Sequence, residues 1–303
     1  MKIGIPRALL YYFHHDLWLN FFKNLNIETI VSPETNKAIV EMGVNNSIDE
    51  ACFSSKIFIG HVGYLQDKCN VVFVPRIENT GIREEYCTRI FGVYDLVRNT
   101  FPNVKCLHAD VNYLYGKSEP GAFIEIGEAL GKDKSESLEA YNNALLTANS
   151  IKEAKILQQE KLLNSNGTKI LIFAHAYNSY DAAVGKEITD FFIDNNIKVA
   201  YADVINEKEA QLLTQKSYGK RIYCRVTAQQ IGGIKKYKDN VDGIVIISTF
   251  PCGPDAIFSE LLIRQIKDKP ILNIVIDELD SKAGIQTRME SFIDIINNRE
   301  VKH

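Results

Sequence analysis

The chain has 303 residues, 46% of them hydrophobic and 24% charged, which is ordinary for a globular protein of two domains. Its net charge of −3 gives no electrostatic basis for binding nucleic acid or an anionic membrane surface. The sequence has no apolar run of membrane-spanning length and no N-terminal secretory signal, so we expect a cytoplasmic protein with no membrane partner.

Short apolar runs alternate with amphipathic segments in the first part of the chain. This pattern predicts strands at residues 2–5, 28–31, 70–75 and 104–109, and helices at 17–25, 35–42, 52–65 and 87–97. Thr35 is the expected N-cap of its helix. Regular strand–helix alternation indicates a parallel sheet covered by helices.

The middle of the chain, residues 121–163, is rich in Glu, Ala, Lys and Leu and predicts helices, the second of them from about 152 to 163. A second alternation then predicts strands at 169–173, 198–201, 244–247 and 271–276, and helices at 182–194, 226–237, 256–266 and 283–296. We expect 202–219 to be irregular. The predicted fold class is α/β, with flavodoxin-like or Rossmann-like doubly wound lobes at 1–115 and 166–303 joined by a helical segment at 116–165.

Three of the six cysteines share one local setting. Cys52 and Cys87 each stand where a helix is expected to begin, and Cys252 lies between a buried strand and a helix in IVIISTFPCGPDA. Ligands bind at the carboxyl ends of parallel strands, and helix N-termini favour a thiolate over a thiol. One such cysteine is as easily a small buried hydrophobe, but three in the same setting favour a functional site.

The other three cysteines look structural. Cys69 enters a predicted strand and Cys106 lies inside one, so we expect both to be packing residues. Cys224 lies at or inside the start of a helix, and packing is the favoured interpretation there too.

Polar residues follow the predicted strands of the second lobe. His175 ends the strand ILIFAH and, with Tyr177 and Asp181, would line a polar pocket, although a hydrogen-bonded loop histidine explains the pattern equally well. Asp277 and Glu278 follow the last strand and either face the same cleft or cap the final helix.

In the first lobe, His61 stands in the apolar helical run IFIGHVGYL, so we expect a hydrogen-bonded core histidine rather than a ligand. Arg83 and Arg288 would serve as anion contacts or, more simply, in salt bridges.

Common catalytic motifs are missing from the sequence. There is no GxGxxG, Walker A, HExxH or GxSxG pattern, which disfavours dinucleotide enzymes, nucleotide hydrolases, zincins and serine hydrolases. There is also no CxxC pair. Three thiolates gathered by the fold would suit an iron–sulfur cluster better than a hard cation, whereas a structural zinc normally needs four ligands.

Six ordered segments resemble one family: GIPRALLYY, DEACFSSKIFIGHV, EEYCTRIFG, AHAYNSYDAAVGKEI, STFPCGPDA and IVIDELDSKAGIQTRMESF. The chain is similar to proteins related to 2-hydroxyacyl-CoA dehydratases, their D-component-like members and their activases. The resemblance implies that Cys52, Cys87 and Cys252 hold a [4Fe–4S] cluster or a double-cubane [8Fe–9S]-type cluster. It implies an oxidoreductase or dehydratase-like component that reduces a small-molecule or acyl-thioester substrate.

The resemblance also implies partners. The electron donor would be an ATP-dependent activase, an ASKHA-type ATPase with its own cluster, and the chain would form a homodimer or pair with a related subunit. The alternative hypothesis is a non-redox binding or assembly module whose cleft between the lobes binds a metabolite. In that case His175, Tyr177 and Asp277 would matter more than the thiols.

Overall fold

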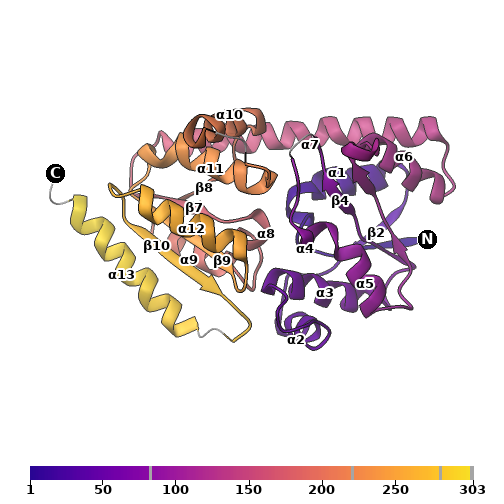
Figure 1. The fold of residues 1–303 in the computed structure, drawn as a ribbon, viewed down its shortest axis with the longest axis horizontal. Coiled ribbons are helices and arrows are strands. Elements are labelled where there is room, and N and C mark those ends of the chain that lie inside the picture. The colour runs from indigo at the N-terminus through magenta and orange to yellow at the C-terminus, as the bar shows by residue number, and fades with distance from the viewer. Residues whose placement is uncertain (82–83, 220–221, 280–281, 301–303) are drawn as a thin grey trace. The chain divides into compact units, whose positions relative to one another are not determined.

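The computed structural model describes residues 1–81, 84–219, 222–279 and 282–300. The described residues form two compact units. Unit 1 comprises Met1–Ala154 with Ile222–Arg225, and unit 2 comprises the remainder from Lys155 onwards. Within the described ranges, no helix has both the length and the apolar character needed to cross a membrane. The predicted α/β class is confirmed, since both units are built on parallel sheets flanked by helices (Figure 1).

Unit 1 contains a four-stranded parallel sheet with strand order β2-β1-β3-β5. Its strands are β1 (Lys2–Ile5), β2 (Glu28–Val31), β3 (Val71–Phe73) and β5 (Cys106–Leu107). All four fall where the sequence predicts strands, although β3 and β5 are shorter than expected. The order reverses beside β1, which is the flavodoxin-like switch point where ligands bind in such sheets.

Unit 1 also contains a parallel strand pair that sequence analysis missed, β4 (Arg76–Asn79) with β6 (Asp110–Asn112). The buried Asn79 Nδ2 donates to Asn112 Oδ1 at 2.8 Å, and Asn112 Nδ2 donates to Glu78 Oε2 at 2.6 Å. Polar side chains therefore hold the two strands together. No strand is predicted from the sequence here because neither strand contains the apolar run that indicates one.

The helices of unit 1 differ from expectation mainly at their ends. They are α1 (Tyr11–Asn24), α2 (Lys37–Asn45), α3 (Phe53–Leu65), α4 (Thr88–Phe91), α5 (Val93–Thr100), the 3-10 turn η1 (Tyr113–Tyr115), α6 (Glu119–Ala129) and α7 (Lys134–Leu163). The helix predicted at 87–97 is two helices that meet at Gly92. The N-cap of α2 is Asn36, whose side chain accepts from Ile39 N, and not Thr35. Helix α7 is one continuous helix of 30 residues (Figure 1), where the sequence predicts that a second helix begins only at about residue 152.

Two glycines set the position of α3, the helix that begins after Cys52. A Cβ on Gly43 would lie 2.0 Å from the carbonyl oxygen of Lys56, and a Cβ on Gly60 would lie 2.0 Å from that of Ile39. Helices α2 and α3 therefore pack backbone against backbone. Any side chain at either glycine would push α3, and with it Cys52, away from α2.

Unit 2 repeats the same topology. Its parallel sheet has the order β10-β9-β7-β8 and consists of β7 (Lys169–Phe173), β8 (Lys198–Tyr201), β9 (Gly243–Thr249) and β10 (Ile271–Ile276). All seven residues of β9 are buried, as expected for a central parallel strand. The order reverses between β7 and β9, so the loops after these two strands flank the switch point.

The helices of unit 2 include two that the sequence did not predict, the short α8 (Ala176–Ser179) and the longer α10 (Glu207–Tyr218). The others are α9 (Lys186–Asp194), α11 (Arg225–Tyr237, with the 3-10 turn η2 at Lys238–Asn240), α12 (Gly253–Gln265) and α13 (Lys282–Glu300). The expectation that 202–219 is irregular is wrong, because α10 occupies most of it. Asn206 caps the start of α10 through its side chain, and Gly219, with φ of 67°, ends it.

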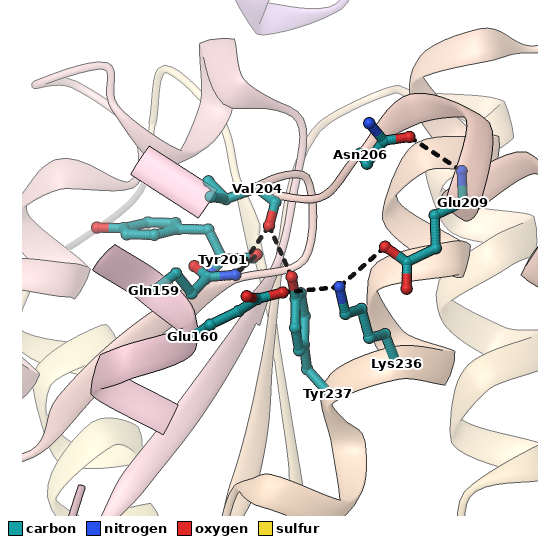
Figure 2. A network of polar contacts seen from close by, with 8 residues as sticks. All are labelled: Gln159, Glu160, Tyr201, Val204, Asn206, Glu209, Lys236 and Tyr237. Carbon is teal, nitrogen blue, oxygen red and sulfur yellow. Dashed lines mark hydrogen bonds and ion pairs between the residues drawn. The ribbon is translucent and has the colours of Figure 1, made fainter. Parts of the chain in front are cut away.

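A polar network fixes α10 and α11 against the last turns of α7 (Figure 2). Lys236 Nζ lies 2.8 Å from Glu160 Oε1 and 2.9 Å from Glu209 Oε2. Gln159 Nε2 donates to the carbonyls of Tyr201 and Val204 at 2.9 and 3.0 Å. These contacts lie within unit 2 and attach three helices to the β8 end of its sheet.

Candidate functional site

Cys52 is the N-cap residue of α3, as the sequence predicts. Its backbone is extended, with φ of −63° and ψ of 147°, and its carbonyl accepts from Ser55 N at 2.8 Å and Lys56 N at 3.1 Å. Because α3 leads back to the start of β3, its first residues lie towards the carboxyl edge of the sheet. This places the thiol of Cys52 on the side of unit 1 where ligands are expected.

His61 anchors the middle of α3 and is a core histidine, as expected. Its Nδ1 lies 2.8 Å from Ser32 Oγ and its Nε2 2.9 Å from Thr35 Oγ1. Burial, helped by the nearby Arg7 guanidinium, lowers the pKa of His61 to about 3. The imidazole is therefore neutral, and it joins α3 to the segment that follows β2.

Cys87 is the N-cap residue of α4. Its pKa is raised to about 11 because the effect of burial outweighs that of the backbone N–H groups of Ile90 and Arg89, which lower it. The expectation that a helix start alone favours the thiolate is therefore wrong at Cys87.

Cys224 is the residue near Cys87 that sequence analysis assigned to packing. It forms an isolated parallel bridge with Glu85. Glu85 N donates to Tyr223 O at 2.9 Å, and Arg225 N donates to Glu85 O at 3.1 Å. No local sequence signal predicts this pairing, because about 140 residues separate the two segments.

Cys69 packs against Gly4, in agreement with the packing role predicted for it, and Cys106 lies in β5, the strand in which the sequence places it. Cys69 Sγ donates to Leu65 O at 3.2 Å, and a Cβ on Gly4 would lie only 2.6 Å from that sulfur. Burial raises the pKa of both thiols. All six cysteines lie within the described residues, and none of them forms a disulfide.

In unit 2, Cys252 is the N-cap residue of α12 and follows β9 by a short loop, as the sequence predicts. Its N–H donates to Thr249 O at 2.9 Å, and the preceding Phe250–Pro251 peptide bond is cis. A Cβ on Gly253 would meet no protein atom within 4 Å. Internal packing therefore gives no reason for the glycine beside Cys252.

His175 and Asp255 form a buried pair beside the loop of Cys252. Their relative exposures are 3% and 7%, and His175 Nε2 lies 2.8 Å from Asp255 Oδ1. Gln230 Nε2 donates to His175 Nδ1 at 2.6 Å, which leaves Nε2–H to donate to the carboxylate. Asp255 stands in the first turn of α12, so this pair connects the end of β7 to the helix that begins after Cys252.

The remaining predicted pocket residues lie in the same unit. Tyr177 stacks on His175 with ring centroids 4.9 Å apart, and the buried Asp181 accepts from Ala183 N at 2.9 Å. Asp277 Oδ1 accepts from Leu279 N at 2.7 Å. Arg288 donates to the carbonyl of Asn273, and Arg83 lies outside the described residues.

The family model described as "CoA enzyme activase uncharacterised domain (DUF2229)" matches residues 2–205. The chain belongs to this family. Its matched region contains Cys52 and Cys87, and it ends before Cys224 and Cys252. The six sequence motifs predicted a relation to the acyl-CoA dehydratase activase system, and the family match supports that relation. No curated protein sequence matches the chain.

Some solved structures are weakly similar to this activase-family protein. A zinc-bound variant of AdcAII from Streptococcus pneumoniae is 14% identical, with 98% of each chain covered and a TM-score of 0.29. ZnuA is 10% identical, with 98% of each chain covered and a TM-score of 0.27. TM-scores this low support no conclusion about the fold or function of this protein.

Among the residues that the structure describes, no three His, Cys, Asp or Glu side chains are grouped so that they would hold a metal ion. The donor atoms that the sequence offers for a metal group are thiols, which suit soft metals. Thiolates around an iron–sulfur cluster stand farther apart than those around one ion, because several iron and sulfide atoms lie between them.

Proposed function

We propose that this chain is an iron–sulfur redox component of a CoA enzyme activase system. Cys52, Cys87 and Cys252 are its proposed thiolate ligands, as the family resemblance implies. The chain would receive low-potential electrons from an ATP-dependent activase and pass them to a small-molecule or acyl-thioester substrate. A bound cluster would supply reversible one-electron transfer.

One observation carries the proposal: Cys52 and Cys87 both stand at helix starts in a member of the activase-domain family. Soft thiolate donors favour iron–sulfur groups over hard cations. The raised pKa of Cys87 fits a metal ligand as well, since iron binding would release its proton and remove the cost of burying a bare thiolate.

The surroundings of Cys87 would influence the reduction potential of a bound cluster. The N–H groups of Arg89 and Ile90 stabilise negative charge on the sulfur. Hydrogen bonds to ligand sulfurs and the exclusion of water are two means by which proteins set the potential of a cluster. In unit 2, the contact of His175 with Asp255 would hold the start of α12 and so the backbone of Cys252.

The proposal includes a protein partner beyond the activase. Two large apolar side chains near Cys252 in the chain are exposed, Phe250 at 59% and Ile257 at 62%. Exposed apolar groups of this size are typical of surfaces that a partner covers. A second copy of the chain, or a related subunit, would shield the cluster from water and oxygen.

Anaerobic reconstitution with iron and sulfide tests the proposal. We expect stoichiometric iron and acid-labile sulfide, and an EPR signal that appears when a purified dehydratase activase and ATP are added together. Omitting ATP should abolish this signal, because the potential of the site requires hydrolysis to drive the electron. Protein that remains folded and takes up no iron would contradict the proposal and favour a metabolite-binding module.

A further inference from the structure

An exposed apolar turn follows β6 in unit 1. The 3-10 turn η1 consists of Tyr113, Leu114 and Tyr115, which are 44%, 58% and 79% exposed. Together they leave on the order of 300 Å² of surface uncovered, since one aromatic side chain offers about 150–250 Å². We propose that η1 is a docking site for a transient protein partner, the ATP-dependent activase. The inference rests on the proposed function for the identity of this partner.

Backbone hydrogen bonds hold the turn in one conformation. Asn112 N donates to Lys117 O at 2.8 Å and Lys117 N donates to Asn112 O at 2.9 Å, which closes the turn as an antiparallel bridge. Gly116 N donates to Tyr113 O at 3.2 Å, and Gly116 has the left-handed φ of 73° that favours glycine. A turn fixed in this way loses little conformational freedom when a partner binds it.

Buried amide groups support the turn from the protein side. Asn79 Nδ2 donates to Asn112 Oδ1 at 2.8 Å, and Asn112 Nδ2 donates to Glu78 Oε2 at 2.6 Å. Asn79 Oδ1 also accepts from Leu114 N, in the turn itself, at 3.4 Å. Buried amides destabilise a fold unless they are hydrogen-bonded. This network therefore holds in place a turn whose own side chains bury little surface.

The composition of the turn favours a protein partner over a membrane or a nucleic acid. Residues 113–116 are uncharged, and the one cation in the segment 110–119 is Lys117, whose Nζ is paired with Asp110. Anionic membranes and nucleic acids are bound through clusters of basic residues. Tyrosine is enriched, and charged residues are depleted, at the centre of protein interfaces.

The size of the turn favours a transient partner over a second copy of the chain. A stable interface buries about 800 Å² on each partner, more than twice what the turn exposes. Patches of a few hundred Å² are nevertheless often functional, and electron-transfer encounters have the smallest interfaces. An electron donor that binds and then dissociates needs an interface of this kind.

The turn lies beside the segment that leads to Cys87. Leu114 is hydrogen-bonded to Asn79, which forms an antiparallel bridge with Glu85, two residues before Cys87. Each of these steps is one strand spacing or two residues along a strand, about 5–7 Å. A partner bound to the turn would therefore be held close to one of the proposed ligands.

The test measures, by calorimetry, the binding of a purified dehydratase activase to full-length wild type and to Tyr115→Ser, Leu114→Ser and Leu146→Ser. Leu146 is the matched control for Leu114, because it is a similarly exposed leucine of unit 1 that lies on α7. We expect the Kd to rise at least about tenfold for Tyr115→Ser and about fivefold for Leu114→Ser, and to be unchanged for Leu146→Ser. The affinity should differ little between low and high salt, because the turn is uncharged.

The outcomes separate this inference from the proposed function. Wild-type affinity in both turn variants would overturn the inference and leave the proposed function standing. If wild type does not bind the activase, the inference is wrong, while iron and sulfide contents still test the cluster. Loss of a stable dimer, or of binding to anionic vesicles, in the turn variants would show another occupant and contradict the inference.

Hydrogen exchange of the wild-type chain decides if a turn variant fails to fold. Addition of the activase should slow exchange in residues 113–117 and leave the middle of α7 unchanged. Unchanged exchange in residues 113–117 with bound activase would contradict the inference.

Discussion

The two units present cysteines at helix starts in different surroundings. In unit 1, Cys87 is a buried thiol beside the backbone N–H groups of Ile90 and Arg89, and its segment is paired with that of Cys224. In unit 2, the helix that begins after Cys252 is held by the buried contact between His175 and Asp255. The same topology therefore supports a thiol fixed by backbone pairing in one unit and a buried polar support in the other.

This difference predicts different consequences of mutation in the two units. Breaking the polar support of unit 2 should cost stability, whereas changing thiols in unit 1 should cost metal binding.

The largest stability effect is expected from Asp255→Ala in unit 2. It leaves the Nε2–H group of His175 buried without its acceptor, and breaking a buried charged hydrogen bond costs about 3 kcal/mol of unfolding free energy. Urea unfolding monitored by hydrogen exchange in β9 and α12 measures this. Ser259→Ala in the same helix is the control, since its buried Oγ has no hydrogen-bond partner and its loss should cost little. Equal effects of the two changes would contradict the role of the pair.

In unit 1, the corresponding polar support is His61, and it predicts a pH dependence. Because its pKa is lowered to about 3 in the folded protein, the unfolded state binds more protons below its ordinary value of 6.5. Stability is therefore retained above that value and lost as the pH falls towards the folded pKa, by about 2 kcal/mol between pH 7 and pH 5. His61→Gln should flatten this slope in urea titrations, whatever it does to absolute stability. An unchanged slope would show that other groups cause the loss.

The smallest effect is expected from the ion-pair network of unit 2 (Figure 2). Burial opposes the charge of Lys236, but hydrogen bonds to Glu160 and Glu209 raise its pKa above the ordinary value. The three side chains are partly exposed, so Lys236→Met should cost only about 0.5–1 kcal/mol, and less in high salt. Lys37→Met, which breaks the exposed pair with Glu41, should cost about 0.3 kcal/mol or less. Thermal melts at two salt concentrations distinguish the two variants.

The sequence predicts the sheets well because buried parallel strands are continuous apolar runs. β1, β7 and β10 appear at the expected residues. The sequence does not predict α10, whose exposed face and polar composition hide its periodicity, although Asn206 and Gly219 mark its ends. Helix starts at Cys52, Cys87 and Cys252 follow from local signals.

The environment of the thiols depends on long-range contacts and could not be predicted. The bridge between Glu85 and Cys224 joins segments that no local pattern connects. The pKa of Cys87 reflects burial by residues distant in the chain, and this burial outweighs the local effect of the helix start. Asp255 was missed as the partner of His175 because a first-turn acid is usually explained as a helix-terminal charge.

The most direct test of the central claim is the iron and sulfide content of two double variants. Cys52→Ser with Cys87→Ser changes the proposed ligands of unit 1, and Cys69→Ser with Cys106→Ser changes packing thiols of the same unit. After anaerobic reconstitution, we expect the first variant to stay folded and to hold almost no iron or sulfide, while the second matches wild type. Equal iron and sulfide contents in the two variants would contradict this expectation.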